Sequence, residues 1–252
     1  MIEINNIDKN INKNKLDWLL ENFEKIKYST PIVKQPKIIL IGEYHKSKRN
    51  KLTRLWGYDY LKLAIDDNFI KTQIDLDKKN FQSNQAIFTS RTDRNSEQLI
   101  KIWQNKIFPH KENIQLLITP TPNMKNLDKF NIFYRKMKDQ LDLINDLKNS
   151  RVMLVPGHKA ELFCLAAEEA RELCIPIITL GIGSLKERVL HNETGFIANN
   201  DTQFAKYTLD IFNDNDLYMQ IKKNLYKLRN KNNWLQSTKD FLRVLNKWKK
   251  KF

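Results

Sequence analysis

The chain has 252 residues, of which 41% are hydrophobic, and a formal net charge of +15. This length accommodates one large domain or one and a half smaller ones, and the hydrophobic content supports a packed core. No apolar run reaches membrane-spanning length, and the first residues lack the apolar segment of a signal peptide, which argues against an integral membrane or secreted protein. We therefore expect a soluble, cytoplasmic protein, with peripheral contact to the inner membrane surface as an option.

The excess of basic residues has two explanations that the sequence leaves open. One is an anionic partner, such as nucleic acid, a membrane surface or a phosphate-bearing substrate. The other is composition, because Lys, Asn and Ile are abundant along the whole chain. The positive charge is diffuse, apart from local concentrations at residues 46–51 and 247–252.

The two cysteines, Cys164 and Cys174, lie ten residues apart on one predicted helix and its exit. A rise of about 1.5 Å per residue separates them by about 15 Å, which is too far for a disulfide. We expect two core thiols in a reducing compartment, and their spacing does not fit a zinc site.

Residues 1–83 are expected to contain few regular elements. Apolar periodicity indicates one amphipathic helix there, and β-branched runs indicate two strands. The expected order is a polar start at 1–14, a helix at 16–26, a strand at 37–42, a basic helix at 45–55, a short strand at 60–66 and a polar linker at 71–84.

Residues 84–252 alternate strand-like and helix-like segments, which predicts an α/β fold with a parallel sheet covered by helices on both faces. Asn95 or Ser96 is a plausible cap of the first helix. The expected strands are 85–91, 114–120, 131–136, 153–155 and 175–180, followed by an extended piece near 196–201, and the expected helices are 95–107, 139–150, 161–173, 185–190, 202–213, 217–231 and 234–248.

Residues 153–197 form the most informative stretch, because they read as strand, helix, strand, helix with short joints. Pro156 and Gly157 indicate a turn after the first strand, and Gly181 and Gly183 open a loop after the second. In such a βαβ unit, ligands bind at the carboxyl ends of the strands.

Two glutamates on the predicted helix of this unit are candidate ligand contacts. Glu161 is expected at the helix entrance and Glu169 two turns further along. A carboxylate at the entrance can accept hydrogen bonds from ligand hydroxyls, while the free N–H groups of the first turn favour a phosphate beside it. The alternative is that both are solvated helix charges, like Glu168 and Glu172 of the same segment.

The order of residues in this stretch resembles the C-terminal domain of retaining GT-B glycosyltransferases of the family 4-like group. The resemblance implies a Rossmann-like nucleotide-sugar-binding domain at 84–252. Residues 1–83 would then comprise an N-terminal helix, a remnant of the acceptor-binding domain with an interdomain segment that ends near Asp66 and Phe69, and a linker. The matching residues are Pro156, Glu161, Phe163, Glu169, Ala170, Pro176, Gly181, Gly183, Glu187, Val189, Thr194, Gly195 and Phe196.

Arg91 and Arg94 follow the predicted strand at 85–91, at the place where a phosphate clamp is expected. Guanidinium groups bind diphosphate oxygens bidentately and stabilise charge on a departing nucleoside diphosphate. The resemblance makes Arg94 the equivalent of the family lysine, with Arg91 a looser match. Surface arginines of a basic protein are the alternative.

The resemblance also implies roles for the residues of the central stretch. Glu169 would hold the ribose hydroxyls, and Glu161 would contact the transferred sugar or position the attacking hydroxyl; with Arg91 and Arg94, Glu161 is the predicted catalytic group. The family usually has Gly on both sides of Phe163, where this chain has Leu162 and Cys164. His158 either contacts the donor or caps the helix. The predicted donor-binding residues are Glu169, His158, Phe163, Gly183, Ser184 and Thr194.

No metal or cofactor is expected. Two Asp-x-Asp patterns occur, at 75–77 and 214–216, but neither follows a buried strand, and we interpret both as chance. The predicted arginines and the helix N-terminus supply positive charge in place of a metal.

Three functional hypotheses follow. The first is retaining, metal-independent transfer from a UDP- or GDP-sugar to a glycan or lipid-linked acceptor in polysaccharide or glycoconjugate biosynthesis. The second is a non-catalytic or half-enzyme donor-binding subunit that needs a partner chain, or a second copy, for the acceptor site. The third is a basic protein that binds nucleic acid or an anionic membrane, with nucleic acid the less expected partner. The last helix is expected to dock on residues 15–60 or on a second copy.

Overall fold

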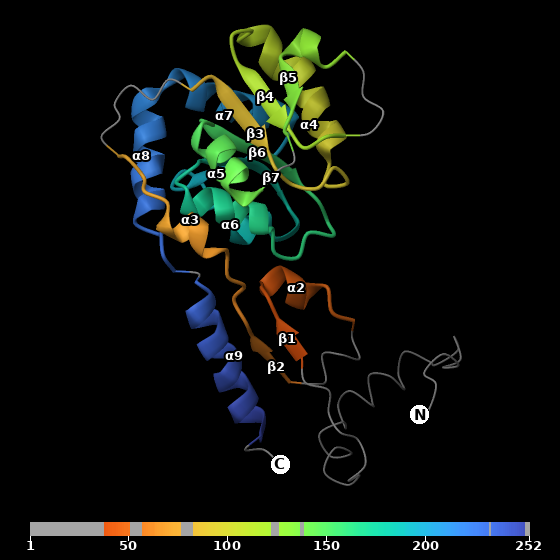
Figure 1. Cartoon of the computed structure of the whole chain (residues 1–252). Helices are drawn as coiled ribbons and strands as arrows, with labels where there is room; N and C mark the ends of the chain where they lie inside the picture. Colours follow the sequence, from red (N-terminus) through yellow and green to blue (C-terminus); the bar gives the residue numbers. More distant parts are fainter. Residues whose placement is uncertain are drawn as a thin grey trace, which may run out of the picture.

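The computed structural model describes residues 38–50, 57–76, 83–121, 126–136, 139–231 and 233–249. They form a six-stranded parallel sheet with helices on both faces, and a two-stranded parallel sheet beside α2 (Glu43–Ser47) (Figure 1). The predicted α/β class is therefore confirmed. The helix expected at 16–26 and the second half of the basic helix expected at 45–55 lie outside the described residues.

The large sheet has the strand order β5-β4-β3-β6-β7-β8, and each neighbouring pair is parallel. Counted from β3, this is the order 3-2-1-4-5-6, which reverses direction between β3 and β6. The strands are β3 (Gln85–Phe88), β4 (Gln115–Ile118), β5 (Ile132–Tyr134), β6 (Val152–Gly157), β7 (Ile177–Ile182) and β8 (Gly195–Ile197).

Alternating side chains of the central strands build one core on each face of the sheet. Phe88 points into the core that includes Trp103 and Phe204, whereas Ile87 points into the core that includes Leu147 and Ala170. The first core lies under α4 (Ser96–Ile102), its π-helical continuation (Trp103–Ile107), α7 (Asp201–Asn213) and α8 (Asn215–Tyr226), and the second under α5 (Gln140–Lys148) and α6 (Leu165–Glu172). Short 3-10 helices span Phe108–His110 and Asp128–Phe130.

The chain reaches this domain through α3 (Asp67–Lys71). The Asp66 side chain caps α3 by accepting from the Asn68 N–H, and Phe69 is fully buried in the core under α5 and α6. The predicted end of the interdomain segment is thus anchored in the large domain. The domain boundary after residue 83 stays a prediction.

The two-stranded sheet pairs β1 (Ile38–Leu40) with β2 (Tyr58–Tyr60), and α9 (Trp234–Lys249) lies beside it (Figure 1). Lys247 forms an ion pair with Asp59, and the Ser237 hydroxyl donates to the Lys62 carbonyl at 2.7 Å. The expected docking of the last helix on the N-terminal part is borne out at Asp59. The strand expected at 60–66 is wrong beyond Tyr60, because the residues after β2 are irregular.

Three sequence expectations in the central stretch are wrong in detail. Pro156 and Gly157 belong to β6, and Gly181 belongs to β7, because the two strands stay paired to Ile182 across a bulge. The helix expected at 161–173 starts only at Leu165, and the one expected at 185–190 is a 3-10 helix, η6 (Gly183–Glu187). The loop after β6 is therefore longer than the sequence pattern indicated, whereas η6 follows β7 directly.

Candidate functional site

The candidate site lies at the carboxyl ends of β3 and β6, where the strand order reverses and where open α/β sheets bind ligands; we call this place the crevice. Arg94 comes from the loop after β3 and Glu161 from the loop after β6. The Arg94 Nε lies 3.5 Å from the Glu161 Oε2, with the two side chains only 16% and 22% exposed. The Asn95 side-chain amide donates to the Gly157 carbonyl and ties the two loops together. The structure thus unites the two residues on which the sequence prediction depended.

Asn95 does not cap α4 in the expected way. Its backbone is left-handed and its side chain makes no hydrogen bond to the first turn of the helix. The side chain instead crosses the reversal point to β6, so Asn95 shapes the crevice. Sequence reasoning missed this role because the partner, the Gly157 carbonyl, is 62 residues away.

The loop after β6 folds on itself through its own polar groups. The His158 Nδ1 accepts from the Ala160 N–H at 3.1 Å, and the His158 carbonyl accepts from the Glu161 N–H at 3.0 Å. The Glu161 Oε1 then accepts from the Cys164 N–H at 3.0 Å, just before α6. One oxygen of Glu161 therefore holds the loop, and the other faces Arg94.

Gly183 and Ser184 press against this loop from the end of β7. The Ser184 N–H donates to the Glu161 carbonyl at 3.0 Å. The Ser184 side chain is fully buried, and its Oγ, like the Oγ1 of Thr89 at the end of β3, has no hydrogen-bond partner among the described residues. Buried hydroxyls without partners are costly, so these two are donors and acceptors that a ligand could satisfy.

The predicted phosphate clamp is part of an ion-pair network. Asp93, which the sequence prediction overlooked, accepts from the Arg94 NH1 at 2.8 Å and from the Arg91 NH2 at 3.0 Å through one oxygen. Arg91 is 77% exposed and lies at the outer edge of the network. With Glu161, the two arginines and two carboxylates sum to zero charge, so an incoming diphosphate would compete with Asp93 for the guanidinium groups.

Glu169 lies on the second turn of α6 and is half-buried. Burial raises the pKa of its carboxyl, Arg135 opposes that rise, and Asp66 adds to it. Arg135 directly follows β5 and pairs with Asp146 at 3.0 Å. The second predicted carboxylate is therefore associated with Arg135 and Asp66, while Glu161 is associated with Arg94.

Two predicted donor contacts have structural partners of their own. Phe163 is buried under the Arg188 guanidinium, whose carbon lies 4.0 Å from the ring centre. The Thr194 Oγ1 accepts from the Leu190 N–H at 2.9 Å inside a turn. Their contact with a donor stays a prediction. Glu168, which the sequence suggested could be a solvated charge, is instead 1% exposed and paired with Arg188 at 3.0 Å.

The N-terminal part touches the crevice through α2. Glu187 of η6 accepts from the backbone N–H groups of Glu43 and Tyr44, and the Tyr44 hydroxyl donates to the Lys159 carbonyl at 2.7 Å. A side chain at Gly42 would collide with the Glu187 carboxylate. These contacts fix α2 directly beside the loop that carries Glu161.

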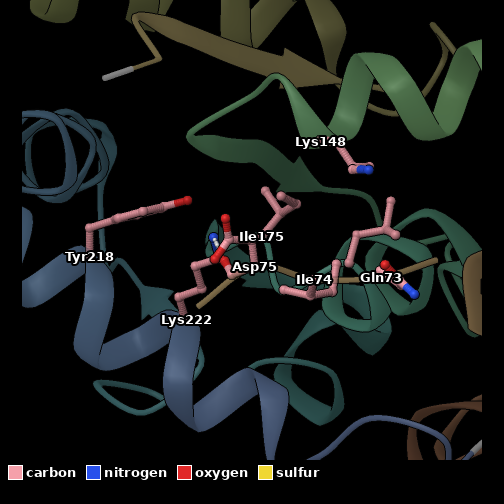
Figure 2. Close-up of a pocket in the computed structure, with 8 residues that line it drawn as sticks. Gln73, Ile74, Asp75, Lys148, Ile175, Tyr218 and Lys222 are labelled. Carbon is pink, nitrogen blue, oxygen red and sulfur yellow. Dashed lines mark hydrogen bonds between the residues drawn. The ribbon is translucent and has the colours of Figure 1, made fainter. Parts of the chain in front are cut away.

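A small cavity of about 90 Å³ lies between the 73–75 segment and α8. Figure 2 shows the Tyr218 and Lys222 side chains extending from α8 toward Ile175 and Asp75. The Lys222 Nζ donates to the Asp75 carbonyl at 2.8 Å and so fastens the incoming chain. Ile175 precedes β7, so this cavity is at the amino-end edge of the sheet, opposite the crevice.

The second Asp-x-Asp pattern has a structural explanation, because the Asp214 side chain caps α8 by accepting from the Leu217 N–H. Asp77 of the first pattern lies outside the described residues. Among the described residues, no group of three or more His, Cys, Asp or Glu side chains is placed to hold a metal ion. Nor does any helix within them combine the length and apolarity that a membrane span requires.

The sheet order and the polar crevice at its reversal point define a Rossmann-like α/β domain of the GT-B type. Residues 123–228 match the family model described as glycosyl transferases group 1. No curated protein sequence matches the chain.

Solved structures with this fold include several glycosyltransferases. A point mutant of TarM from S. aureus, in complex with fondaparinux, alpha-GlcNAc-glycerol and UDP, has a TM-score of 0.66 at 14% identity, and the match covers 96% of this chain and 48% of TarM. Sucrose-phosphate synthase from Thermosynechococcus elongatus has a TM-score of 0.69 at 15% identity, with 86% and 59% covered. HepE from Anabaena, in complex with UDP-glucose, has a TM-score of 0.65 at 12% identity, with 92% and 69% covered. At such identities the likeness defines the fold, and the chain spans about half the length of TarM.

Proposed function

We propose that this chain binds a UDP- or GDP-sugar in the crevice between β3 and β6 and takes part in sugar transfer with retention and without a metal ion. The observation that carries the proposal is the meeting of Arg94 and Glu161 at the reversal point of the sheet, 3.5 Å apart. Ligands of open α/β sheets bind at such a point. The UDP and UDP-glucose in the TarM and HepE structures support a nucleotide-sugar donor.

In this proposal, Arg94 supplies the charge that the leaving diphosphate needs. Binding of the diphosphate would draw Arg94 away from Asp93, and charge-assisted bidentate bonds to phosphate would replace that ion pair. Glu161, freed from Arg94 on one oxygen, would face the sugar, while its other oxygen continues to hold the Cys164 N–H. The buried hydroxyl of Ser184 would satisfy its missing hydrogen bond on the ligand.

Calorimetric titration with a panel of nucleoside diphosphates tests the proposal. Substitutions at two neighbouring residues should change the nucleotide affinity in opposite directions. Arg94→Ala removes the clamp, and we expect it to weaken binding of the preferred nucleotide by at least about tenfold. Asp93→Asn removes the competing carboxylate, and we expect it to tighten binding by about threefold or more, because the diphosphate no longer competes with Asp93 for Arg91 and Arg94.

Asp67→Asn is the matched control for the charge change, because Asp67 is exposed at the start of α3 and pairs only with Lys71 in the described structure. The nucleotide affinity of Asp67→Asn should equal that of the parent chain. If no nucleoside diphosphate binds the parent chain, the proposed function is wrong. If Asp93→Asn weakens binding, the competition between Asp93 and the diphosphate is wrong.

Glu169 provides a prediction that links pH and function. Because burial raises its folded pKa, the ionised carboxylate destabilises the fold at neutral pH, and this cost disappears as pH falls below the ordinary value of 4.5. Glu169→Gln should therefore raise the melting temperature at neutral pH and leave it unchanged well below that value. If Glu169 holds the ribose hydroxyls, the same substitution should weaken nucleotide binding at neutral pH.

A side chain that costs stability yet serves a ligand is expected at functional sites. Glu112→Gln is the control, because Glu112 is exposed in the turn before the amino end of β4, and it should shift neither quantity. An unchanged melting temperature at neutral pH would contradict the stability argument. If Glu169→Gln changes the melting temperature but not the nucleotide affinity, Glu169 is not a donor-site residue. The proposed roles of Arg94 and Glu161 are unaffected by that result.

The half-enzyme hypothesis stays a second proposal, because the chain spans about half the length of TarM. Within the described residues, α2 lies beside the crevice, because Tyr44 donates to Glu187 of η6 and to the Lys159 carbonyl. Donor hydrolysis or transfer assays with the purified chain separate the two proposals. Transfer to a glycan or lipid-linked acceptor without any added protein would exclude the half-enzyme.

A further inference from the structure

α9 presents a row of exposed apolar side chains. Val244 is buried, and Ser237 and Lys247 make the contacts to Lys62 and Asp59 described above, so one side of the helix is occupied by the β2 region. Among the α9 side chains that the structure describes, four large apolar ones are exposed: Trp234 at 55%, Leu235 at 67%, Phe241 at 37% and Leu242 at 52%.

These four side chains lie along one side of α9, because seven residues are close to two helical turns. Trp234 and Leu235 each have a partner seven residues later, Phe241 and Leu242, which is two helical turns. Large apolar groups gathered on one exposed helix face mark an interaction surface. We call Trp234, Leu235, Phe241 and Leu242 the apolar row.

The apolar row is bordered by positive charge. Lys239 lies four residues after Leu235 and three before Leu242, and Arg243 follows Lys239 by four, so the two basic side chains run along its edge. Arg243 is 79% exposed and pairs with Asp240 in the same helix, an exposed pair that water screens strongly.

The combination of positive charge and exposed apolar side chains indicates which partner α9 binds. A second copy of the chain would bring another formal charge of +15 against the first, which opposes self-association through α9. An anionic lipid bilayer accepts both components, because apolar side chains enter the acyl boundary while Lys and Arg reach the lipid phosphates.

We propose that α9 binds the surface of an anionic membrane through its apolar row, with Lys239 and Arg243 at the lipid headgroups. This inference does not rest on the proposed sugar transfer. The bound helix would lie in the plane of the interface, and its Ser237 and Val244 side would keep its contacts with the β2 region. Membrane contact, which the sequence suggested from its diffuse positive charge and its basic C-terminal tail, is here proposed for one helix face.

Co-sedimentation of the full chain with lipid vesicles tests the proposal. We expect binding to vesicles of phosphatidylcholine and phosphatidylglycerol in equal amounts, and little binding to phosphatidylcholine alone. Leu235→Ser with Leu242→Ser should weaken binding to the anionic vesicles by at least about tenfold, because two inserted side chains are lost. Lys239→Glu with Arg243→Glu should weaken it by a similar factor of about ten or more.

The matched control is Lys129→Glu with Lys148→Glu, the same charge change at two exposed lysines of the large domain. It should change the vesicle affinity by less than about threefold. The proposal is overturned if the parent chain binds no vesicles, if the control pair loses as much affinity as the α9 pair, or if the double serine variant binds like the parent. If the parent chain binds no vesicles but forms a dimer in light scattering, and the double serine variant is a monomer, then the apolar row binds a second copy of the chain instead. All variants change exposed positions, so circular dichroism should show unchanged folding.

Discussion

Glu172→Ala is expected to lower the free energy of unfolding by about 3–5 kcal/mol, because it leaves a buried arginine without its carboxylate. Glu172 is fully buried at the end of α6, where it accepts from the Arg229 Nε at 3.3 Å and from the Asn230 N–H at 3.0 Å. Arg229 also donates to the Thr72 carbonyl at 2.7 Å and the Ile70 carbonyl at 3.0 Å. One ion pair therefore holds α6, the end of α8 and the incoming chain together.

Thermal and urea unfolding measure this effect. The loss corresponds to a melting temperature lower by roughly 6–20 °C for a domain of this size. Glu193→Ala changes an exposed glutamate and should leave the melting temperature unchanged. Replacing both partners, Glu172→Leu with Arg229→Met, should cost less than the sum of the single substitutions, because no charge is left unpaired. A loss below about 1 kcal/mol for Glu172→Ala would show that the pair is open to water.

The sequence predicted the large domain well because its strands are short, buried and apolar on both faces. Neighbouring residues such as Ile87 and Phe88 point into different cores, and a strand that is apolar on both faces leaves few alternatives to a covered parallel sheet. The exact ends of elements were less predictable. The Glu161 carboxylate caps the backbone at Cys164 and so delays the start of α6, a side-chain contact that periodicity does not encode.

Cys164 shows a second limit of the sequence pattern. Its backbone is left-handed, with φ at 62°, a conformation that glycine adopts without cost. The resembling family usually has Gly at this position, and the present chain keeps the backbone shape with a buried cysteine. Burial, together with nearby Glu161, raises the pKa of the thiol to about 12, so Cys164 is not a thiolate nucleophile.

The pairing of charges around the crevice was the least predictable part. Arg94 and Glu161 were expected to meet, because both follow strands that end at the reversal point. Asp93 sits beside Arg94 in the sequence, yet its bonds to both arginines depend on side-chain directions within one loop. Arg188 over Phe163 joins residues 25 positions apart on different elements, and nothing in the sequence marked that pair.

Gly183 is the position where the crevice has the least room for change. Its backbone φ is +75°, and an added Cβ would lie 2.3 Å from the His158 carbonyl oxygen and 3.0 Å from that of Glu161. Both obstacles are backbone atoms, so neither can turn aside like a flexible side chain. A side chain at this position has to push η6 away from the loop that carries Glu161.

Gly183→Ala is therefore expected to reduce both stability and nucleotide binding. The left-handed backbone and the forced displacement together should cost about 2–4 kcal/mol in urea unfolding. Displacement of Glu161 relative to Arg94 should weaken nucleotide binding by about tenfold or more in calorimetry with the variant still folded. Gly57→Ala is the matched control, because nothing lies within 4 Å of its added Cβ, and it should change neither quantity. If Gly183→Ala loses stability but keeps its nucleotide affinity, the contact between η6 and the loop is not part of the donor site. If its stability is unchanged, the close packing around Gly183 is wrong.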